Sequence, residues 1–241
     1  MRFIDHSFAL PAENLAFEEI LLDRVEQGLA PETLRCWESP ARFVVLGTAQ
    51  ENQREVYLDH CEADGVPILR RCSAGGCVLQ GPGCLNFTLI LDFAGRPEIR
   101  SVRASYEYLL TRISAGCRAR GLEAHREGIS DLAIGGVKVS GNAQRRRRRA
   151  MLHHGTLLYQ PDYEGMTRYL REPDDRPEYR GARDHRAFVG AFTLGPDELR
   201  AIILEAFNIE GPSSVPTPDE LAAVHALAHE KYGNPAWTYR R

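Results

Sequence analysis

Apolar side chains recur with the period of a helix in several long stretches of the chain. In residues 13–29 they lie at roughly helical spacing, and the stretch closes with Gly28, which predicts an amphipathic opening helix. Residues 101–120 carry one apolar helical face, and Pro196-Asp197-Glu198 is a typical helix start. The further predicted helices are 162–171, 196–207 and 218–232, and 210–217 is predicted to be a loop.

Short apolar runs bounded by Pro and Gly predict β-strands between these helices. The runs are 33–37, 43–46, 68–71, 87–92, 131–134, 138–140 and 155–159. Strands and helices follow one another in mixed order, without strict repetition of βαβ units. The pattern therefore predicts an α+β fold in which a mixed or mainly antiparallel sheet is flanked by helices.

Composition favours a single domain. With 241 residues, of which 43% are hydrophobic, the chain can bury one substantial core, and we expect 1–241 to be one domain with 210–241 as its C-terminal extension. The first residues do not resemble a signal peptide, and no apolar run approaches the roughly 18 residues of a membrane span. Six cysteines occur without CxxC pairs, so we expect reduced thiols, no zinc site and a soluble cytoplasmic protein.

Charge is distributed unevenly along the chain. The formal charge is −3, and because the arginine run 145–149 contributes +5, the remaining residues carry −8. This balance argues against nucleic-acid binding across a whole face, but it leaves room for a local anion site.

One candidate site is the segment 70–78, between two predicted strands. Two adjacent arginines supply forked donors for phosphate or carboxylate, and the small residues that follow let a ligand approach the main chain. An ordinary glycine-rich hairpin is the alternative interpretation. The segment matches neither a P-loop nor a dinucleotide-binding fingerprint. Its candidate ligand-binding residues are Arg70, Arg71, Ser73, Gly75, Gly76, Cys77 and Val78.

A second candidate site begins at Lys138, before a predicted turn of small residues. A lysine there can direct a point charge at a carbonyl or phosphate, although most lysines are ordinary surface residues. Lys138 and Lys231 are the only lysines of the chain, which has 28 arginines. Retention of lysine against this compositional bias suggests that position 138 requires lysine chemistry.

These two segments resemble the signatures of the lipoate–protein ligase A family, within the biotin/lipoate ligase superfamily. The stretch RRCSAGGCVLQGPGCLNFT resembles the first signature, and KVSGNAQRRRRRAMLHHGTLL resembles the second. In the second signature a lysine is followed at fixed spacing by Gly, Ala, His and Leu. The matching residues here are Lys138, Gly141, Ala143, His154 and Leu158. The resemblance covers about residues 10–195.

The resemblance implies a biotin/lipoate ligase-like catalytic domain. Ligases of this family activate lipoate, or octanoate, with ATP and Mg²⁺ to an acyl-adenylate and then transfer the acyl group to a lysine of a carrier protein. Lys138 would contact the acyl carbonyl and the α-phosphate, and Asp131 would hold Mg²⁺ directly or lie near the phosphates. Segment 70–78 would line the pocket, together with Ser140, Gly141, Asn142, Ala143 and Arg145 beside the adenylate and His154, Gly155 and Thr156 at its closure.

The chain departs from the family pattern in sequence and in length. Ala74 stands where the family usually has glycine, and Gly81 stands where it usually has aspartate. Cys84 and Ser130 each stand where asparagine is usual. Single-chain ligases carry a further C-terminal domain, whereas this chain ends soon after Trp237. The resemblance therefore predicts that a separate small accessory subunit assists activation.

Two other functions remain open at this stage. A transferase of the same fold would move octanoyl or lipoyl groups through a cysteine thioester, without ATP. Such enzymes keep their nucleophile shortly before the residue that Asp131 matches, and 123–130 contains no cysteine. Cys77 and Cys84 could border the pocket, or be small buried hydrophobes. A non-catalytic acyl or nucleotide sensor is the second alternative, whereas biotin ligation is not supported by segment 70–78.

The arginine run 145–149 has two interpretations. It is either a solvated loop between strands or a functional element. In the second case Arg145 would contact phosphate, and 146–149 would attract an acidic lipoyl carrier domain or glycine-cleavage H protein.

Overall fold

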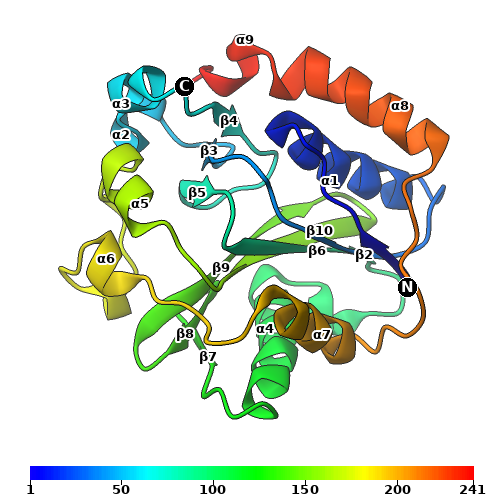
Figure 1. The fold of residues 1–241 in the computed structure, drawn as a ribbon. Helices are drawn as coiled ribbons and strands as arrows, with labels where there is room; N and C mark the ends of the chain where they lie inside the picture. The colour runs from blue at the N-terminus through cyan, green and yellow to red at the C-terminus, as the bar shows by residue number, and fades with distance from the viewer.

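A seven-stranded sheet forms the centre of the computed structural model, which describes residues 1–241 (Figure 1). Its strand order is β1-β2-β6-β10-β9-β8-β7, and only the β1–β2 pair is parallel. The strands are β1 (Arg2–Asp5), β2 (Thr33–Trp37), β6 (Cys84–Asp92), β7 (His125–Glu127), β8 (Asp131–Ile134), β9 (Val137–Arg146) and β10 (Ala150–Leu158). The sheet is therefore mixed and mainly antiparallel, as the sequence predicts.

A smaller sheet lies beside one face of the large one. It has the order β4-β3-β5 and consists of β3 (Phe43–Leu46), β4 (Ile68–Arg70) and β5 (Val78–Gln80). Short helices α2 (Asn52–Glu55), α3 (Leu58–Ala63) and α5 (Tyr163–Tyr169) pack around it on an apolar cluster that includes Val44, Leu46 and Met166.

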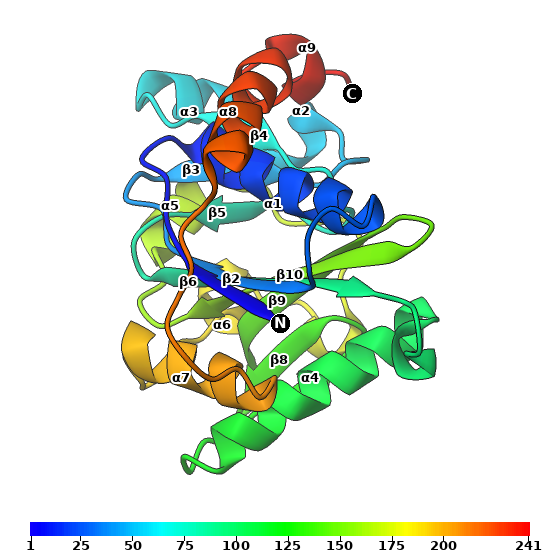
Figure 2. The same ribbon diagram turned by 90° about the vertical axis from the view of Figure 1, so that its right-hand side faces the viewer.

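Helices cover both faces of the large sheet (Figure 2). On one face, α4 (Val102–Arg118) and α7 (Pro196–Ala206) bury a cluster that includes Leu109, Ile113 and Ile202. On the other face, α1 (Pro11–Glu26) packs under α8 (Pro218–Leu227), which continues as a π-helical turn Ala228–Tyr232 and then α9 (Pro235–Thr238). The remaining short elements are the 3-10 turns Pro97–Ile99 and Glu178–Arg180, and α6 (His185–Phe188).

Most predicted elements are present within a few residues of the predicted bounds, and 210–217 is a loop. The predicted turn after Lys138 is wrong, because β9 runs through it without interruption. Asn142 and Ala143 pair with Gly155 and His154 of β10, and this ladder holds small residues extended although they favour turns in isolation. None of the helices combines the length and the apolar character that crossing a bilayer requires.

Candidate functional site

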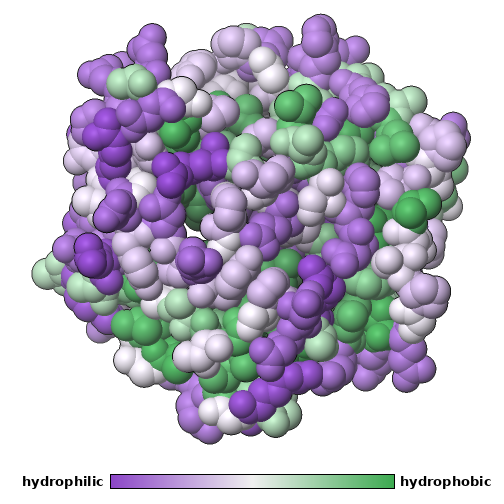
Figure 3. All heavy atoms as spheres, viewed as in Figure 1, coloured by the Kyte–Doolittle hydropathy of each residue, from purple (hydrophilic) through white to green (hydrophobic).

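A central cavity opens between the large sheet, the small sheet and α1. Its empty volume is about 700 Å³, the open mouth included. Figure 3 shows a hollow over the place where β5 and β9 lie in Figure 1, surrounded mostly by hydrophilic residues. We call this space the central cavity.

Strand register brings the floor of the central cavity together. Asp131 pairs with Gly141, Thr156 with Asn86, and Asn86 with Trp37, and the ladder of β9 with β10 joins these pairs into a row across five strands. The residues of this row come from positions 37 to 156 of the sequence. The sheet therefore assembles the floor from residues that no local motif connects.

Close packing explains two glycines of the floor. A Cβ atom on Gly155 would lie 2.0 Å from Asn142 Oδ1 and 2.8 Å from the Phe87 ring. A Cβ atom on Gly141 would lie 2.9 Å from Nζ of Lys138. Lys138 therefore folds back over Gly141, so the spacing of these two residues in the second motif has a steric reason.

The mouth of the central cavity carries a lysine, a carboxylate and a phenol. Lys138 Nζ lies 2.9 Å from Asp131 Oδ1, and the Tyr179 hydroxyl donates to Asp131 Oδ2 at 2.8 Å. Burial, followed by the charge of Asp131, raises the pKa of Tyr179, which therefore remains a donor. Gly190 N donates to Lys138 O, and this anchors the strand that carries the lysine. Tyr179 is a site residue that the sequence motifs did not reveal.

A buried carboxylate organises the inner wall. Glu18 of α1 accepts from Trp37 Nε1 at 3.1 Å and Thr88 Oγ1 at 2.5 Å on one oxygen, and its other oxygen lies 2.6 Å from His154 Nδ1. Burial raises the pKa of Glu18, but His154, Thr88 and Arg35 outweigh this effect and lower it overall. Glu18 is therefore ionised, and because a carboxylate only accepts, His154 must donate from Nδ1.

Hydrogen bonds connect this carboxylate to the glycine-rich loop 73–77. His154 Nε2 lies 2.7 Å from Ser73 Oγ, which accepts from Arg71 Nε at 2.9 Å. Arg71 also donates to the carbonyl oxygens of Ala74 and Gly76, at 2.7 and 3.0 Å. The loop over the central cavity is thus fixed to α1 and β10 through a chain of side chains, which residue spacing alone did not reveal.

Most of the predicted site residues line the central cavity. They are Arg71, Gly75, Gly76, Cys77, Val78, Asp131, Lys138, Gly141, Asn142, Ala143, His154, Gly155 and Thr156. Lining residues that the sequence did not single out are Leu15, Glu18, Trp37, Val45, Gln80, Asn86 and Ser130. Leu15, Glu18, Trp37, Val45 and Ser130 lie outside the two motifs, and Gln80 and Asn86 lie within the first one but were not singled out there.

Arg70 is a correction to the predicted lining. Its side chain is fully buried, away from the central cavity wall. Nε donates to Thr238 O at 2.9 Å, and the other nitrogens donate to Gly47 O, Gln50 O and Asn52 Oδ1 at 2.6 to 2.8 Å. Since every donor group is used within the chain, Arg70 joins the C-terminal segment to loop 47–52 instead of contacting a ligand.

Three other predicted residues also lie outside the wall. Ser73 is fully buried and is connected to the cavity wall through His154 and Arg71. Ser140 is fully buried and accepts from Asn142 Nδ2 at 3.2 Å. Arg145 lies on β9, and its Nε is buried without a hydrogen-bond partner.

Residues 147–149 of the arginine run connect β9 to β10, so the run is a loop only in part. Docking of an acidic carrier by 146–149 stays a prediction. Arg145 and Arg146 belong to β9, and Arg148 is exposed without an ion-pair partner. The other three arginines of 146–149 bind within the chain. Their partners are Ile99 O and Arg100 O for Arg146, at 2.8 Å each, Asp23 for Arg147, at 2.8 Å, and Asp92 for Arg149, at 2.7 Å.

One carboxylate of the mouth fits the predicted metal role. Asp131 and the deeply buried Glu18 are the acidic residues of the cavity wall. Mg²⁺ is commonly held by one or two carboxylates together with substrate phosphates. Asp131 alone is therefore suited to a metal ion that binds together with a nucleotide. The carboxylate would then release Lys138 and contact the ion.

Cys77 and Cys84, the cysteines near the central cavity, are poorly suited to act as nucleophiles. Burial raises the pKa of Cys77 and raises that of Cys84 to about 12. Cys77 lines the central cavity, whereas Cys84 does not. Because the thiolate is the nucleophile, a raised pKa lowers the reactivity of both.

The neighbouring His153 gives a pH prediction. Burial lowers its pKa to about 3, and its ring lies between Phe87 and Tyr106, with Nδ1 3.1 Å from Gln144 Nε2. Between pH 6.5 and about 3 the unfolded chain therefore binds a proton that the folded chain does not, so acid favours unfolding. From pH 6.5 to 4.5 the parent should lose about 2 kcal/mol more unfolding free energy than His153→Gln. Urea denaturation at both pH values measures this difference, and equal losses would exclude the mechanism.

Comparison with known proteins identifies relatives of two kinds. The family model for the lipoyl protein ligase A/B catalytic domain matches residues 10–205. The chain is 26% identical to the octanoyltransferase LipM of Geobacillus kaustophilus, covering 100% of this chain and 98% of that protein. It is 28% identical to the lipoate-protein ligase LplJ of Bacillus subtilis, covering 100% of this chain and 74% of that protein.

Solved structures share the fold. One, from Thermoplasma acidophilum, is described as a bipartite lipoate protein ligase and its E2 lipoyl domain; it has a TM-score of 0.84 at 23% identity, over 99% of this chain and 95% of that one. Another, lipoate-protein ligase A bound with ATP, also has a TM-score of 0.84, at 22% identity, over 99% of this chain and 98% of that one.

Proposed function

The chain belongs to the lipoyl protein ligase A/B catalytic domain family, and on this premise we propose that it is a lipoate–protein ligase. It activates lipoate or octanoate with ATP and transfers the acyl group to a lysine of a carrier protein. Relatives named as ligases and as octanoyltransferases both support acyl transfer to proteins. The choice between the two chemistries depends on the residues of this chain.

The observation that favours adenylation over thioester transfer is the position of Lys138 at the mouth of the central cavity, together with the lack of a cysteine suited to act as a nucleophile. The ammonium lies beside Asp131 at 2.9 Å and can exchange this partner for phosphate and carbonyl oxygens. Segment 123–130 contains no cysteine, and the pKa of Cys77 is raised by burial. Positioning and charge neutralisation suffice for adenylation, whereas a thioester route requires a thiolate.

The other residues of the central cavity then divide into two regions. Asp131 would hold Mg²⁺ together with the phosphates, and the main chain of 75–78 and 141–143 would lie beside the adenylate. Trp37 and Leu15 would enclose the end of the acyl chain, while Glu18 fixes the indole. ATP and Mg²⁺ supply the activation of the carboxylate, and the protein supplies alignment and the exclusion of water.

Octanoyl transfer without ATP remains the second candidate function. The specific observation in its favour is similarity to LipM over nearly the full length of both proteins. In this reaction a cysteine would accept the octanoyl group from one carrier, releasing that carrier's thiol, and then pass it to a lysine. Cys77 is the one cysteine in the cavity wall.

The two reactions make opposite predictions for a cysteine variant. Cys77→Ser should retain at least about half of the parent activity with lipoate, Mg-ATP and a lipoyl carrier domain, because adenylation does not use the half-buried thiol as a nucleophile. The measurement is the formation of lipoyl-AMP and of lipoylated carrier, with Cys84→Ser as the matched control. Transfer from octanoyl-carrier without ATP, abolished by Cys77→Ser, would show that the enzyme is a transferase.

We also propose that residues 1–241 act as one catalytic domain and that the acceptor is a lipoyl carrier domain or H protein. The C-terminal segment is tied into the fold, because Trp237 Nε1 donates to Arg70 O at 2.7 Å and Lys231 pairs with Glu19. A structural neighbour described as bipartite, with an E2 lipoyl domain, supports both the carrier and a separate accessory subunit. A rate comparison with and without that subunit tests its role.

A further inference from the structure

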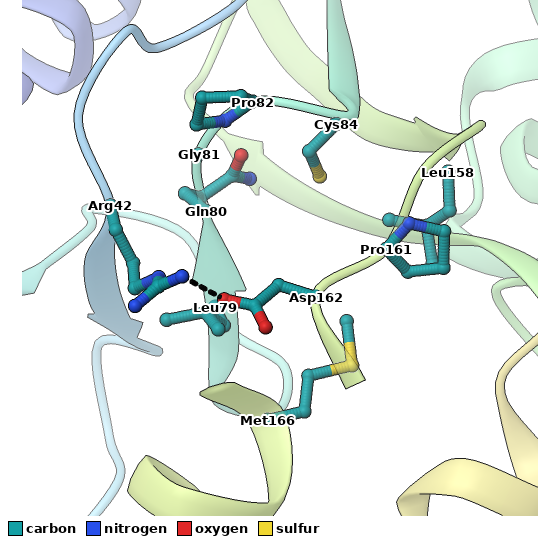
Figure 4. Close-up of a pocket in the computed structure, with 10 residues that line it drawn as sticks. All are labelled: Arg42, Leu79, Gln80, Gly81, Pro82, Cys84, Leu158, Pro161, Asp162 and Met166. Atoms are coloured by element: carbon teal, nitrogen blue, oxygen red, sulfur yellow. Dashed lines mark ion pairs between the residues drawn. The ribbon is translucent and has the colours of Figure 1, made fainter. Parts of the chain in front are cut away.

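A second cavity lies next to the central cavity, on the far side of β5. Its empty volume is about 480 Å³, open solvent at its edge included, and we call it the side cavity. Figure 4 shows that Leu79, Leu158, Met166 and Cys84 surround it, together with two prolines. On one side Arg42 Nη2 pairs with Asp162 Oδ2 at 2.6 Å. The lining is mainly apolar, with an ion pair at one edge.

A pair of side-chain amides separates the two cavities. Gln80 belongs to the wall of both, and Asn86 belongs to that of the central cavity. Gln80 Nε2 donates to Asn86 Oδ1 at 2.8 Å, and Asn86 Nδ2 donates to Gln80 Oε1 at 3.0 Å. Asn86 Nδ2 also lies 3.1 Å from Cys84 O. Both residues are buried, so the pair is a hydrogen-bonded partition between two spaces.

The partition lies at the distance from the mouth that an eight-carbon acyl chain requires. Asp131, beside Lys138, is on β8, and Asn86 is on β6, three strands away in the same row. Three strand spacings are about 14 Å. An extended chain advances about 1.25 Å per bond, so the seven C–C bonds of an octanoyl chain span about 9 Å, and van der Waals contact with the lining adds about 4 Å. Its last carbons would therefore reach Asn86, Gln80 and Trp37.

We propose that the Gln80–Asn86 amide pair sets the length of the acyl chain that the site accepts, by closing the side cavity off from the central cavity. This inference rests on the proposed function, because it takes an acyl chain as the ligand. A longer apolar chain could pass only through the space that the Gln80 side chain fills, and the two buried hydrogen bonds with Asn86 hold that side chain in place. The lining beyond the partition is suited to methylene groups.

Removal of the partition should change the preferred chain length. Gln80→Ala deletes most of the shared side chain and joins the central cavity to the side cavity. Each methylene that then enters apolar surroundings should strengthen binding about fourfold, the equivalent of ~0.8 kcal/mol. The expected occupant of the side cavity is thus the end of a saturated chain of ten to twelve carbons.

The experiment measures binding of straight-chain acids of six to fourteen carbons to the whole chain by calorimetry, without ATP or carrier. The parent should bind octanoate best, and Gln80→Ala should bind dodecanoate at least tenfold more tightly than the parent does. Gln80→Leu is the matched control, since it loses the hydrogen bonds but keeps the volume, and it should retain the parent profile. Cys84→Leu added to Gln80→Ala should reverse the gain by filling the side cavity.

The outcomes separate this inference from the proposed function. If the parent binds octanoate but Gln80→Ala has the same length profile, the partition does not set the length and the inference is wrong. An equal gain in Gln80→Leu would also overturn it, because volume would then not be the cause. If the parent binds none of the acids, the proposed function itself is wrong. Should Gln80→Ala fail to fold, Gln80→Ser is measured in its place with the same criteria.

Discussion

Replacing Lys138 with Ala is expected to lower the rate of acyl-adenylate formation about 10²- to 10³-fold, the usual effect of removing one preorganised charge from a transition state. The ammonium is held at the mouth by Asp131 at 2.9 Å and is folded over Gly141. Since Asp131 keeps its hydrogen bond from Tyr179, the fold around the mouth should survive the change. The measurement is single-turnover formation of lipoyl-AMP from lipoate and Mg-ATP.

The chain offers a matched control for this lysine. Lys231 pairs with Glu19 at 2.7 Å, and its Nζ lies 4.2 Å from the Trp237 ring centroid, outside the central cavity wall. Lys231→Arg retains the charge and should leave the adenylation rate near that of the parent. Lys138→Arg should recover little, because a planar guanidinium does not reproduce the compact ammonium that is folded over Gly141. Retention of more than about a tenth of the activity by Lys138→Ala would contradict the proposed role.

Replacing Glu18 with Ala should lower the free energy of unfolding by roughly 3–5 kcal/mol, because three buried donors lose a charged acceptor at a cost of about 1–3 kcal/mol each. The carboxylate serves Trp37, Thr88 and His154, and each would lose a buried acceptor. Against a total stability of about 5–15 kcal/mol for a typical domain, this loss is large but leaves a folded protein at low temperature. Urea denaturation measures it.

A conservative variant distinguishes the loss of hydrogen bonds from the loss of charge. Glu18→Gln keeps one oxygen for Trp37 and Thr88, and its amide can donate to His154 Nδ1 if the ring carries its proton on Nε2. It should therefore lose only about 1–2 kcal/mol. A Glu18→Ala variant as stable as the parent would mean that this carboxylate does not organise the inner wall. The depressed pKa of Glu18 adds a pH signature, because its stabilising effect is present above the unfolded value of 4.5 and is lost as the pH falls through the folded value.

The sequence predicted only part of the candidate site. The motifs around 70–78 and 138–156 predicted Lys138 and His154 for one site because both motifs are local segments with fixed spacing, and the family resemblance added Asp131. Arg70 and Arg71 are adjacent and chemically identical, yet Arg70 holds the C-terminal segment while Arg71 holds the loop. Strand alternation makes neighbours face opposite ways, so spacing could not tell which arginine faces the ligand.

For Glu18 and the arginine run, the sequence likewise did not predict which charged side chains are buried or paired. Glu18 belongs to an ordinary helix pattern, and only the packing of α1 on β2, β6 and β10 makes it a buried acceptor for three strands. The run 145–149 suggested a basic surface, but Arg147 and Arg149 pair with carboxylates of distant segments and Arg146 donates to distant carbonyl oxygens. Ion pairs between residues far apart in sequence depend on tertiary contacts, which composition does not contain.

The sequence by itself determined the α+β class, the bounds of the long helices and the family, because periodicity, capping residues and motif spacing are local properties of the chain. The tertiary structure alone decided that β9 runs through Ser140 to Arg146, since its pairing with β10 outweighs the turn preference of small residues. It also decided which side chains share the central cavity and that Gln80 and Asn86 divide it from the side cavity. Such partitions arise from register between strands distant in sequence, and one residue of slip would turn every side chain to the other face.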